Sequence, residues 1–146
     1  MDPYSDLSRA DLTGMRLKGN LQRRNLLGAN LTNADLSKAD LTDANLRDAN
    51  LTGAILYRTK LSKADLSGAN LSRANLTGAD LSKANLRHAN LTGADLTNAD
   101  LTGADLSYAD LTGADLTNAI LIHAEDDGTI MPDGTKIPVT PDIDDY

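Results

Sequence analysis

The chain has 146 residues, of which 40% are apolar but only 3% aromatic, and it contains no phenylalanine, tryptophan or cysteine. Without cysteine it has no disulfide, no thiolate metal site and no cysteine nucleophile. No apolar run approaches the roughly 18 residues of a membrane span, and the first residues lack the basic start and apolar stretch of a signal peptide. These features predict one soluble, cytoplasmic domain.

The net charge of −7 is unevenly distributed along the chain. Residues 1–87 contain 13 basic and 9 acidic residues, whereas residues 88–146 contain only Lys136 against 12 acidic residues. An acidic surface does not displace the counterions of nucleic acids or anionic membranes. We therefore expect binding to neither nucleic acid nor membrane.

A five-residue repeat dominates the chain. Every fifth residue from Leu26 to Leu121 is leucine, at twenty positions without exception. Alanine stands two residues before the leucine at 18 of these positions, Asp or Asn usually lies between them, and Ser or Thr usually follows. Four earlier leucines extend the series, with one residue missing before Asn20: Leu7, Leu12, Leu17 and Leu21.

The repeat predicts short extended segments joined by corners. Alternation of Ala, Asp/Asn and Leu is typical of an extended segment whose Ala and Leu point inward and whose polar residue points outward. The last two residues of each repeat, often ending in Gly or Asn, suit a turn. An α-helix is excluded, because each step of five residues would rotate the leucine by about 140° around the helix.

The repeat Ala-(Asp/Asn)-Leu-X-X resembles the signature of the pentapeptide-repeat family, and its regular all-leucine form resembles members from cyanobacteria. The resemblance covers about four-fifths of the chain. It implies an all-β fold, a right-handed quadrilateral parallel β-helix with four repeats per coil, to which the residues after Ala124 add a C-terminal hairpin-like cap. We expect a lead-in over 1–6, about six coils over 7–124, the cap over 125–139 and a flexible acidic tail over 140–146.

With four repeats per coil, residues twenty apart should stack. Asp95 would then lie beside Asp115, and Asp80 beside Asp100. Like charges about 4.8 to 10 Å apart raise one another's pKa, so we expect raised carboxyl pKa values in these pairs. Outward Asn and Thr stacks would hydrogen-bond along the axis.

The two ends of such a rod expose apolar layers and strand edges. Near the C-terminus, Pro-Asp-Gly separates two short extended runs and predicts a hairpin. We expect Ile120 and Ile122 to pack against it, and four of its side chains to cover the last leucine layer: Ile130, Met131, Ile137 and Val139. The N-terminal end has no such cap, so its first coil either serves as the cap or supports self-association.

Two surfaces are candidates for contact with a partner. The first is formed by five outward aspartates of the C-terminal coils: Asp95, Asp100, Asp105, Asp110 and Asp115. The second is the least regular part of the repeat and contains Ile55, Tyr57, Arg58 and Lys60. An exposed aromatic residue beside an arginine is typical of a protein-contact anchor, although drift at a tolerant surface would also explain the irregularity.

No phosphate loop, dinucleotide fingerprint or nucleophile elbow occurs, and a filled interior leaves no pocket of ligand size. We expect no catalytic, cofactor-binding or metal site. The sequence predicts a non-enzymatic protein that binds a protein partner through its solenoid surface. The family resemblance implies an alternative, because some members act as DNA mimics that occupy the DNA-binding saddle of DNA gyrase. The acidic residues of 95–127 would then form the mimic.

Overall fold

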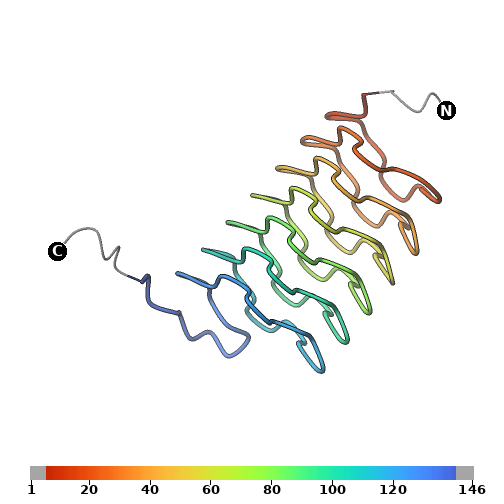
Figure 1. The fold of residues 1–146 in the computed structure, drawn as a ribbon. Helices are drawn as coiled ribbons and strands as arrows, with labels where there is room; N and C mark the ends of the chain where they lie inside the picture. Colours follow the sequence, from red (N-terminus) through yellow and green to blue (C-terminus); the bar gives the residue numbers. More distant parts are fainter. Residues whose placement is uncertain (1–5, 141–146) are drawn as a thin grey trace.

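The computed structural model describes residues 6–140. The chain winds into a right-handed quadrilateral β-helix, a rod of stacked coils with the N-terminal coils at one end and the C-terminal coils at the other (Figure 1). Residues 6–140 contain no helix, and no strand there is longer than one residue, because each flat side of a coil contributes a single bridging residue. This architecture confirms the fold expected from the repeat.

Four ladders of parallel bridges run along the rod, one on each side. Side 1 carries Asp11, Asn30, Asn50, Asn70, Asn90, Asp110 and Ile130. Side 2 carries Arg16, Asp35, Ile55, Asn75, Asp95 and Asp115. Side 3 carries Asn20, Asp40, Lys60, Asp80, Asp100 and Ile120. Side 4 carries Asn25, Asn45, Asp65, Asn85, Asp105 and Glu125.

Bridged residues are twenty apart except in the first coil. There Asp11 pairs with Asn30 and Arg16 pairs with Asp35, at a spacing of nineteen, whereas Asn20 pairs with Asp40 at twenty. The missing residue is therefore absorbed at the corner before Asn20, where Gly19 takes a positive φ of 89°. From that corner onward every rung is in the same register.

Each corner is a hydrogen-bonded β-turn. The leucine carbonyl accepts from the N–H three residues on, as in Ala29 to Leu26 at 3.0 Å. The second corner residue has a positive φ, which is the hallmark of a type II turn. Glycine supplies it at eight corners of the coils after residue 26, Gly128 included, and other residues, such as Lys38 at 60°, adopt it elsewhere.

The outward Asp or Asn stabilises the corner that follows it. In the repeat at Leu31, Asn30 Oδ1 accepts from the Thr32 N–H at 3.2 Å and from the Thr32 hydroxyl at 2.6 Å. Asx side chains commonly bond the backbone two residues on in this way. The requirement explains both the Asp/Asn before each leucine and the Ser/Thr after it. Axial bonds between stacked Asn side chains are secondary, as in Asn45 to Asn25 at 3.4 Å.

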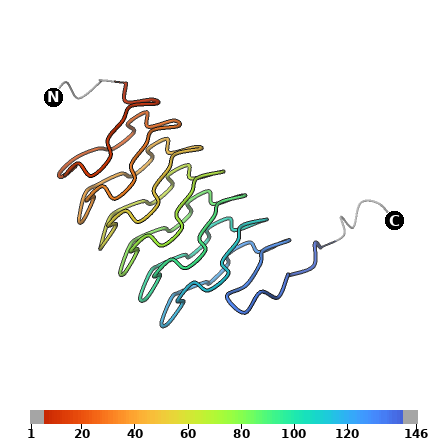
Figure 2. The ribbon, with the colours of Figure 1, turned by 180° about the vertical axis from the view of Figure 1, so that it is seen from behind.

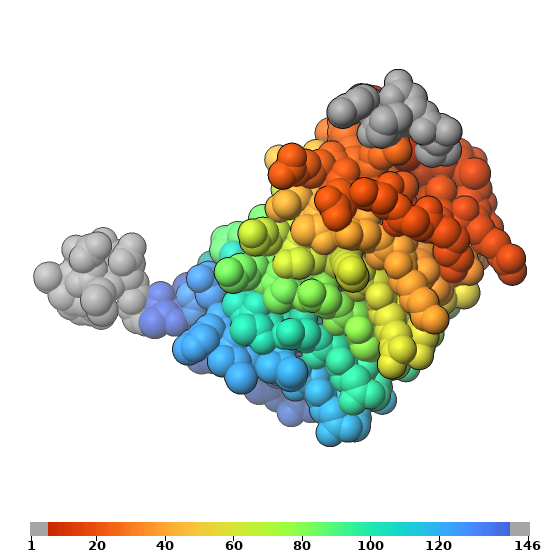
Figure 3. Space-filling view, turned by 45° about the vertical axis from the view of Figure 1, so that its right-hand side comes forward, coloured from red at the N-terminus to blue at the C-terminus, as the bar shows by residue number. Residues whose placement is uncertain are grey.

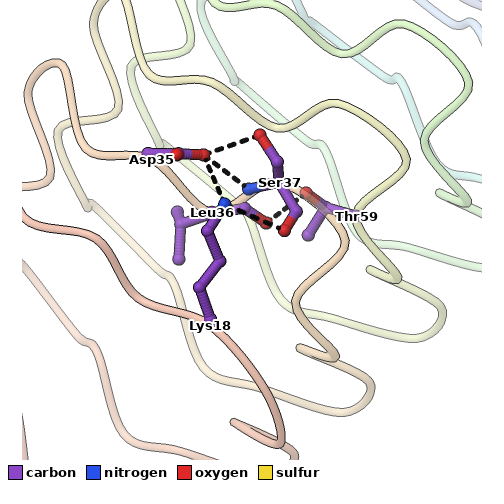
Figure 4. A network of polar contacts seen from close by, with 5 residues as sticks. All are labelled: Lys18, Asp35, Leu36, Ser37 and Thr59. Atoms are coloured by element: carbon purple, nitrogen blue, oxygen red, sulfur yellow. Dashed lines mark hydrogen bonds and ion pairs between the residues drawn. The ribbon is translucent and has the colours of Figure 1, made fainter.

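The core consists of leucine and alanine layers. Every leucine of the repeat from Leu26 to Leu111 is at most 2% exposed. Thr59, which replaces an inner alanine, is also fully buried, and its hydroxyl donates to the Leu36 carbonyl at 2.7 Å (Figure 4). Thr129 repeats this bond to Leu106 at 2.6 Å. A polar residue is therefore tolerated inside where a carbonyl of the preceding coil satisfies it.

At several corners the side chain of the second corner residue leans over the glycine at the same position of the next coil. A Cβ added to Gly93 would lie 3.5 Å from Arg73 Cγ, and one added to Gly103 would lie 3.5 Å from Lys83 Cγ. At Gly128 the added Cβ would lie 2.6 Å from Cδ1 of the Tyr108 ring. Glycine therefore makes room for the large side chain twenty residues earlier.

The repeat geometry continues past residue 124. Glu125 bridges Asp105 and Ile130 bridges Asp110, so the coil proceeds along sides 4 and 1. The chain then reverses, and Ile130 pairs antiparallel with Lys136. The Met131 N–H donates to the Thr135 carbonyl at 2.8 Å, which closes the hairpin. This segment lies at the end of the stack (Figure 2).

The hairpin covers the last leucine layer only in part, since of the expected residues Met131 packs against the core but Val139 does not. It extends side 1 by one strand instead of folding across the end, and Val139 is 49% exposed. Leu121 is 38% exposed, and the expected packing sites Ile120 and Ile122 are 43% and 58% exposed. The predicted flexible tail, apart from Thr140, lies outside the described residues.

The N-terminal leucines are better buried than those at the C-terminal end. Leu12, Leu17 and Leu21 are only 5–6% exposed, although Met15 in the same coil is 43% exposed. The more open apolar layer is therefore at the C-terminal end of the rod. Self-association through the N-terminal coil stays a prediction.

The difference in burial between inner and terminal leucines is testable by replacing single leucines with alanine. We expect Leu66→Ala, in a fully buried position, to lower the free energy of unfolding by about 2 to 5 kcal/mol through loss of burial and creation of a cavity. Leu121→Ala should cost under about 1 kcal/mol, because that side chain is already partly in water. Urea unfolding followed by circular dichroism measures the free energy of unfolding of both variants. Equal losses would contradict the conclusion that the leucine layer at the C-terminal end is partly exposed.

The contact between Gly128 and Tyr108 is testable against a matched glycine. Gly128 and Gly134 both have a positive φ, but only at Gly128 would a Cβ meet a ring. We expect Gly134→Ala to cost about 1 kcal/mol from the left-handed backbone alone, and Gly128→Ala to cost more. Adding Tyr108→Ala to Gly128→Ala should recover the excess, and thermal unfolding that shows no recovery would contradict the contact.

Candidate functional site

The five predicted aspartates encircle the rod and do not share one face. Asp110 lies on side 1, Asp95 and Asp115 on side 2, Asp100 on side 3 and Asp105 on side 4. We call these five residues the acidic belt. In the space-filling view they belong to the cyan and blue bands toward the C-terminal end (Figure 3). Only Asp95 and Asp115 stack directly on one another.

Each carboxylate of the belt is held in place by its own corner. Its Oδ1 atom accepts from the backbone N–H two residues on, at 2.9–3.0 Å. The donors are Thr97, Thr102, Ser107, Thr112 and Thr117. Because the corner uses Oδ1, the Oδ2 atom faces a ligand at every belt residue except Asp105, whose Oδ2 accepts from Arg87.

The corner also determines the charge state, and the expected rise in pKa on side 2 is wrong. The hydroxyl and the N–H of Thr97 lower the pKa of Asp95, and Thr117 does the same for Asp115. The Asp115 carboxylate opposes this at Asp95, but less strongly than those hydrogen bonds. Burial raises the pKa of Asp105, yet bonds from Ser107 and Arg87 outweigh it, so its pKa is lowered too.

Basic residues hardly offset the belt. Arg87 Nη1 lies 3.2 Å from Asp105 Oδ2, and this is the only ion pair within residues 6–140 that reaches the belt. No lysine or arginine occurs between residues 88 and 135. In the N-terminal coils such pairing is closer, as between Lys18 Nζ and Asp35 Oδ1 at 2.9 Å (Figure 4). The belt is therefore a ring of carboxylates with little internal compensation.

The irregular patch lies on sides 2 and 3. Ile55 stacks between Asp35 and Asn75, and Lys60 stacks between Asp40 and Asp80. Tyr57 and Arg58 form the corner between them, with the Arg58 guanidinium carbon 5.6 Å from the centre of the Tyr57 ring. Ile55 is 41% exposed and Tyr57 is 37% exposed.

The patch and the belt share these two sides. On side 2 a single rung, Asn75, separates Ile55 from Asp95, and on side 3 Asp80 separates Lys60 from Asp100. At about 4.8 Å per rung, each pair lies roughly 10 Å apart. The two surfaces that the sequence treated as separate are one continuous surface along sides 2 and 3.

One aromatic pair was not identified from the sequence. His88 and Tyr108 stack at the corner after side 4, with ring centroids 5.0 Å apart and planes 8° from parallel. Arg87 lies 5.6 Å from the centre of the Tyr108 ring. Both rings occupy second corner positions twenty residues apart. Because residues at that spacing stack, the sequence contained the information needed to predict this contact.

The described residues contain no cluster suited to metal binding. Nowhere in residues 6–140 do three His, Cys, Asp or Glu side chains gather to hold a metal ion. The same part of the chain contains no helix with the length and hydropathy of a membrane span. The leucine and alanine layers fill the interior of the rod. What this surface can do chemically is bind, through fixed carboxylates and an exposed aromatic corner.

A four-sided solenoid with a filled core and a polar repeated surface defines the class of protein. Residues 20–53, 54–93 and 94–125 match the model of the family described as pentapeptide repeats, with eight copies. Because these segments make up more than half of the chain, the protein belongs to the pentapeptide-repeat family.

Similar solved structures come from cyanobacteria and a plant. HetL of Nostoc, described as involved in the regulation of heterocyst differentiation, is 40% identical over 90% of this chain and 74% of its own, with a TM-score of 0.47. AT2G44920 from the thylakoid lumen of Arabidopsis thaliana is 34% identical over 70% of this chain and 65% of its own, with a TM-score of 0.58.

The fluoroquinolone resistance protein QnrB1 is 19% identical over 80% of this chain and 72% of its own, with a TM-score of 0.47. At that identity the likeness concerns the fold alone. No curated protein sequence matches this chain.

The lowered pKa values predict a loss of stability in acid. Carboxyls whose folded pKa lies below the ordinary value of 3.8 stabilise the fold above that pH, and the stabilisation is lost as pH falls through the folded pKa values. Near neutral pH both carboxyls stay ionised, so we expect the melting temperature to change little with pH there. Below about pH 4 it should fall, because Asp95 and Asp115 become protonated.

The double variant Asp95→Asn with Asp115→Asn separates this effect from the corner itself. Asn75 on the same side already accepts from the Thr77 N–H at 3.0 Å, so asparagine satisfies the corner without a charge. The variant should melt below the parent at pH 7, because it lacks the stabilisation that the ionised carboxylates supply, and it should lose less stability in acid. A parallel decline of both proteins, measured by circular dichroism, would contradict the assignment.

Proposed function

We propose that this chain is a non-enzymatic binding protein that engages a protein partner through sides 2 and 3. The observation that carries the proposal is the continuous surface on which the ionised belt residues Asp95 and Asp115 follow the patch at Ile55 and Tyr57. The absence of a metal-binding cluster within residues 6–140 agrees with a role in binding.

The chemistry of this surface favours a basic partner. Carboxylates fixed by their own corners lose little conformational freedom on binding, so more of the contact energy is retained. Their uncompensated charge speeds encounter with a positive surface and makes the association sensitive to salt. The exposed apolar and aromatic side chains of the patch supply the desolvated centre that stable interfaces need.

A variant that changes charge without changing the corners tests the proposal. The belt variant replaces all five belt aspartates with asparagine, and the control variant does the same at three aspartates away from sides 2 and 3: Asp11, Asp48 and Asp65. Each protein is immobilised, and the proteins it retains are purified and titrated at about 50 mM and 500 mM salt.

We expect a partner that binds the parent and the control variant at low salt, and that binds the belt variant about tenfold or more weakly. High salt should remove most of this difference, because screening weakens contacts between exposed charges. A partner that binds both variants equally would refute the role of the belt. If the immobilised parent protein retains no partner, the proposal as a whole is refuted.

A second candidate function is a DNA mimic acting on DNA gyrase or another DNA-binding protein. It is favoured by the regular spacing of carboxylates in a segment without lysine or arginine between residues 88 and 135. The purified chain should then inhibit gyrase supercoiling at about 1 µM or below, with added linear DNA relieving the inhibition and the belt variant inactive. No inhibition at tens of micromolar, roughly, would exclude gyrase as the target.

A further inference from the structure

The C-terminal end of the rod has an open strand edge on two sides. In the coil before it, Leu96 and Asn98 donate their N–H groups to the carbonyls of Asp115 and Thr117 at 2.8 and 2.9 Å. Leu101 and Gly103 donate likewise on side 3. The equivalent donors of the last coil have no backbone acceptor within residues 6–140: Leu116, Asn118, Leu121 and His123. We call residues 114–123 the C-terminal ledge.

An open apolar layer accompanies this edge. Leu121 is 38% exposed, whereas the leucines of the inner coils are almost completely buried. A hollow of about 60 Å³ opens beside it, lined mainly by leucines and closed on one side by Met131. Ile120 and Ile122 extend the apolar surface outward, at 43% and 58% exposed. Backbone donors and an apolar floor together are the requirements of strand addition.

The hairpin restricts what can occupy the ledge. Its returning strand pairs with Ile130 and takes the place of the next rung on side 1. A second copy that continued the helix would need that place for its own first coil, so end-to-end stacking of two rods is blocked. An extended segment that turns one corner, from side 2 to side 3, meets no such obstacle.

The outward side chains of the ledge define the chemistry of its occupant. A new rung would lie over Asp115 on side 2 and over Ile120 on side 3. Within the rod, Lys60 stacks between Asp40 and Asp80, which shows how a basic rung fits carboxylates above and below it. A lysine over Asp115 would be stabilised in the same way. Over Ile120 an apolar side chain fits best.

We propose that the C-terminal ledge binds an extended basic segment of a partner protein by parallel strand addition. The segment is about two repeats long, with inward apolar residues over Leu116 and Leu121, a lysine or arginine over Asp115 and an aliphatic residue over Ile120. Main-chain bonds from the four free donors supply affinity, and the outward pair supplies specificity. The site is the end of the rod and uses neither the irregular patch nor the rest of the belt.

The occupant that competes with a partner is the chain's own C-terminal segment. Residues 141–146 have the sequence Pro-Asp-Ile-Asp-Asp-Tyr, with three aspartates and no basic residue. Asp115, and Asp126 at the edge of the hollow, carry the same sign of charge as that segment, which disfavours it in the ledge. A variant that lacks residues 141–146 makes this alternative one outcome of the test.

The probe is a synthetic peptide, Ala-Lys-Leu-Thr-Gly-Ala-Ile-Leu-Thr-Gly, titrated into the full chain by isothermal calorimetry. A second peptide with glutamate in place of lysine is the control. Amide hydrogen exchange by NMR follows the four ledge donors. We expect a Kd of about 10 to 100 µM for the lysine peptide, binding about tenfold weaker for the glutamate peptide, and slower exchange at the four donors.

Two variants test the placement of the peptide. Asp115→Asn keeps its corner but removes the charge, and should weaken the lysine peptide about threefold or more at low salt. Leu121→Asp places a charge on the apolar floor at an already exposed position and should abolish binding. Far-UV circular dichroism checks that both variants retain the rod.

The proposal is overturned if the lysine peptide does not bind at about 1 mM. It is also overturned if the peptide slows exchange at other amides and not at the four ledge donors. It is also overturned if the four donors exchange slowly in the free chain and become fast on removal of residues 141–146, since the chain's own segment would then fill the ledge. The belt experiment shares only Asp115 with this test, and it can fail through sides 2 and 3 while the peptide still protects the ledge.

Discussion

Each coil must return to the same register after twenty residues, because its backbone hydrogen-bonds to the coils directly before and after it. The leucine N–H and the second corner N–H donate to the following coil, and the outward residue donates to the preceding one, as in Asp115 to Ala94. An insertion or deletion of one residue in a central coil would break the match between the rungs before it and the rungs after it. The missing residue lies in the first coil, where it alters only the pairings of Asp11 and Arg16.

Much of this order could be predicted from the sequence, because one inward Leu and one inward Ala in every five residues leave few alternative paths. The role of the outward residues could not. Their spacing of twenty indicated that Asp95 and Asp115 repel one another. Their pKa values depend more on the bonds that each carboxylate accepts from the residue two positions on. Those short bonds depend on the turn geometry, which a repeat pattern does not specify, and they reverse the expected direction of the pKa shift.

The ends were harder to predict than the middle for a related reason. The Pro-Asp-Gly turn correctly indicates a reversal, yet the direction of the returning strand depends on which edge is free where the coil stops. The chain stops on side 1 at Met131, so the strand joins that edge, and Leu121 on side 3 stays uncovered. The irregular patch was found from composition, but its place beside the belt follows from stacking at intervals of twenty.

At three corners a large second corner side chain leans over a glycine twenty residues later. Tyr108 faces Gly128, Arg73 faces Gly93 and Lys83 faces Gly103. Duplicating or deleting one pentapeptide would shift every later corner by a quarter turn relative to the coils before the change. A block of four repeats leaves every later repeat on its own side, so a rod of this kind can lengthen by a whole coil without changing which residues share a side.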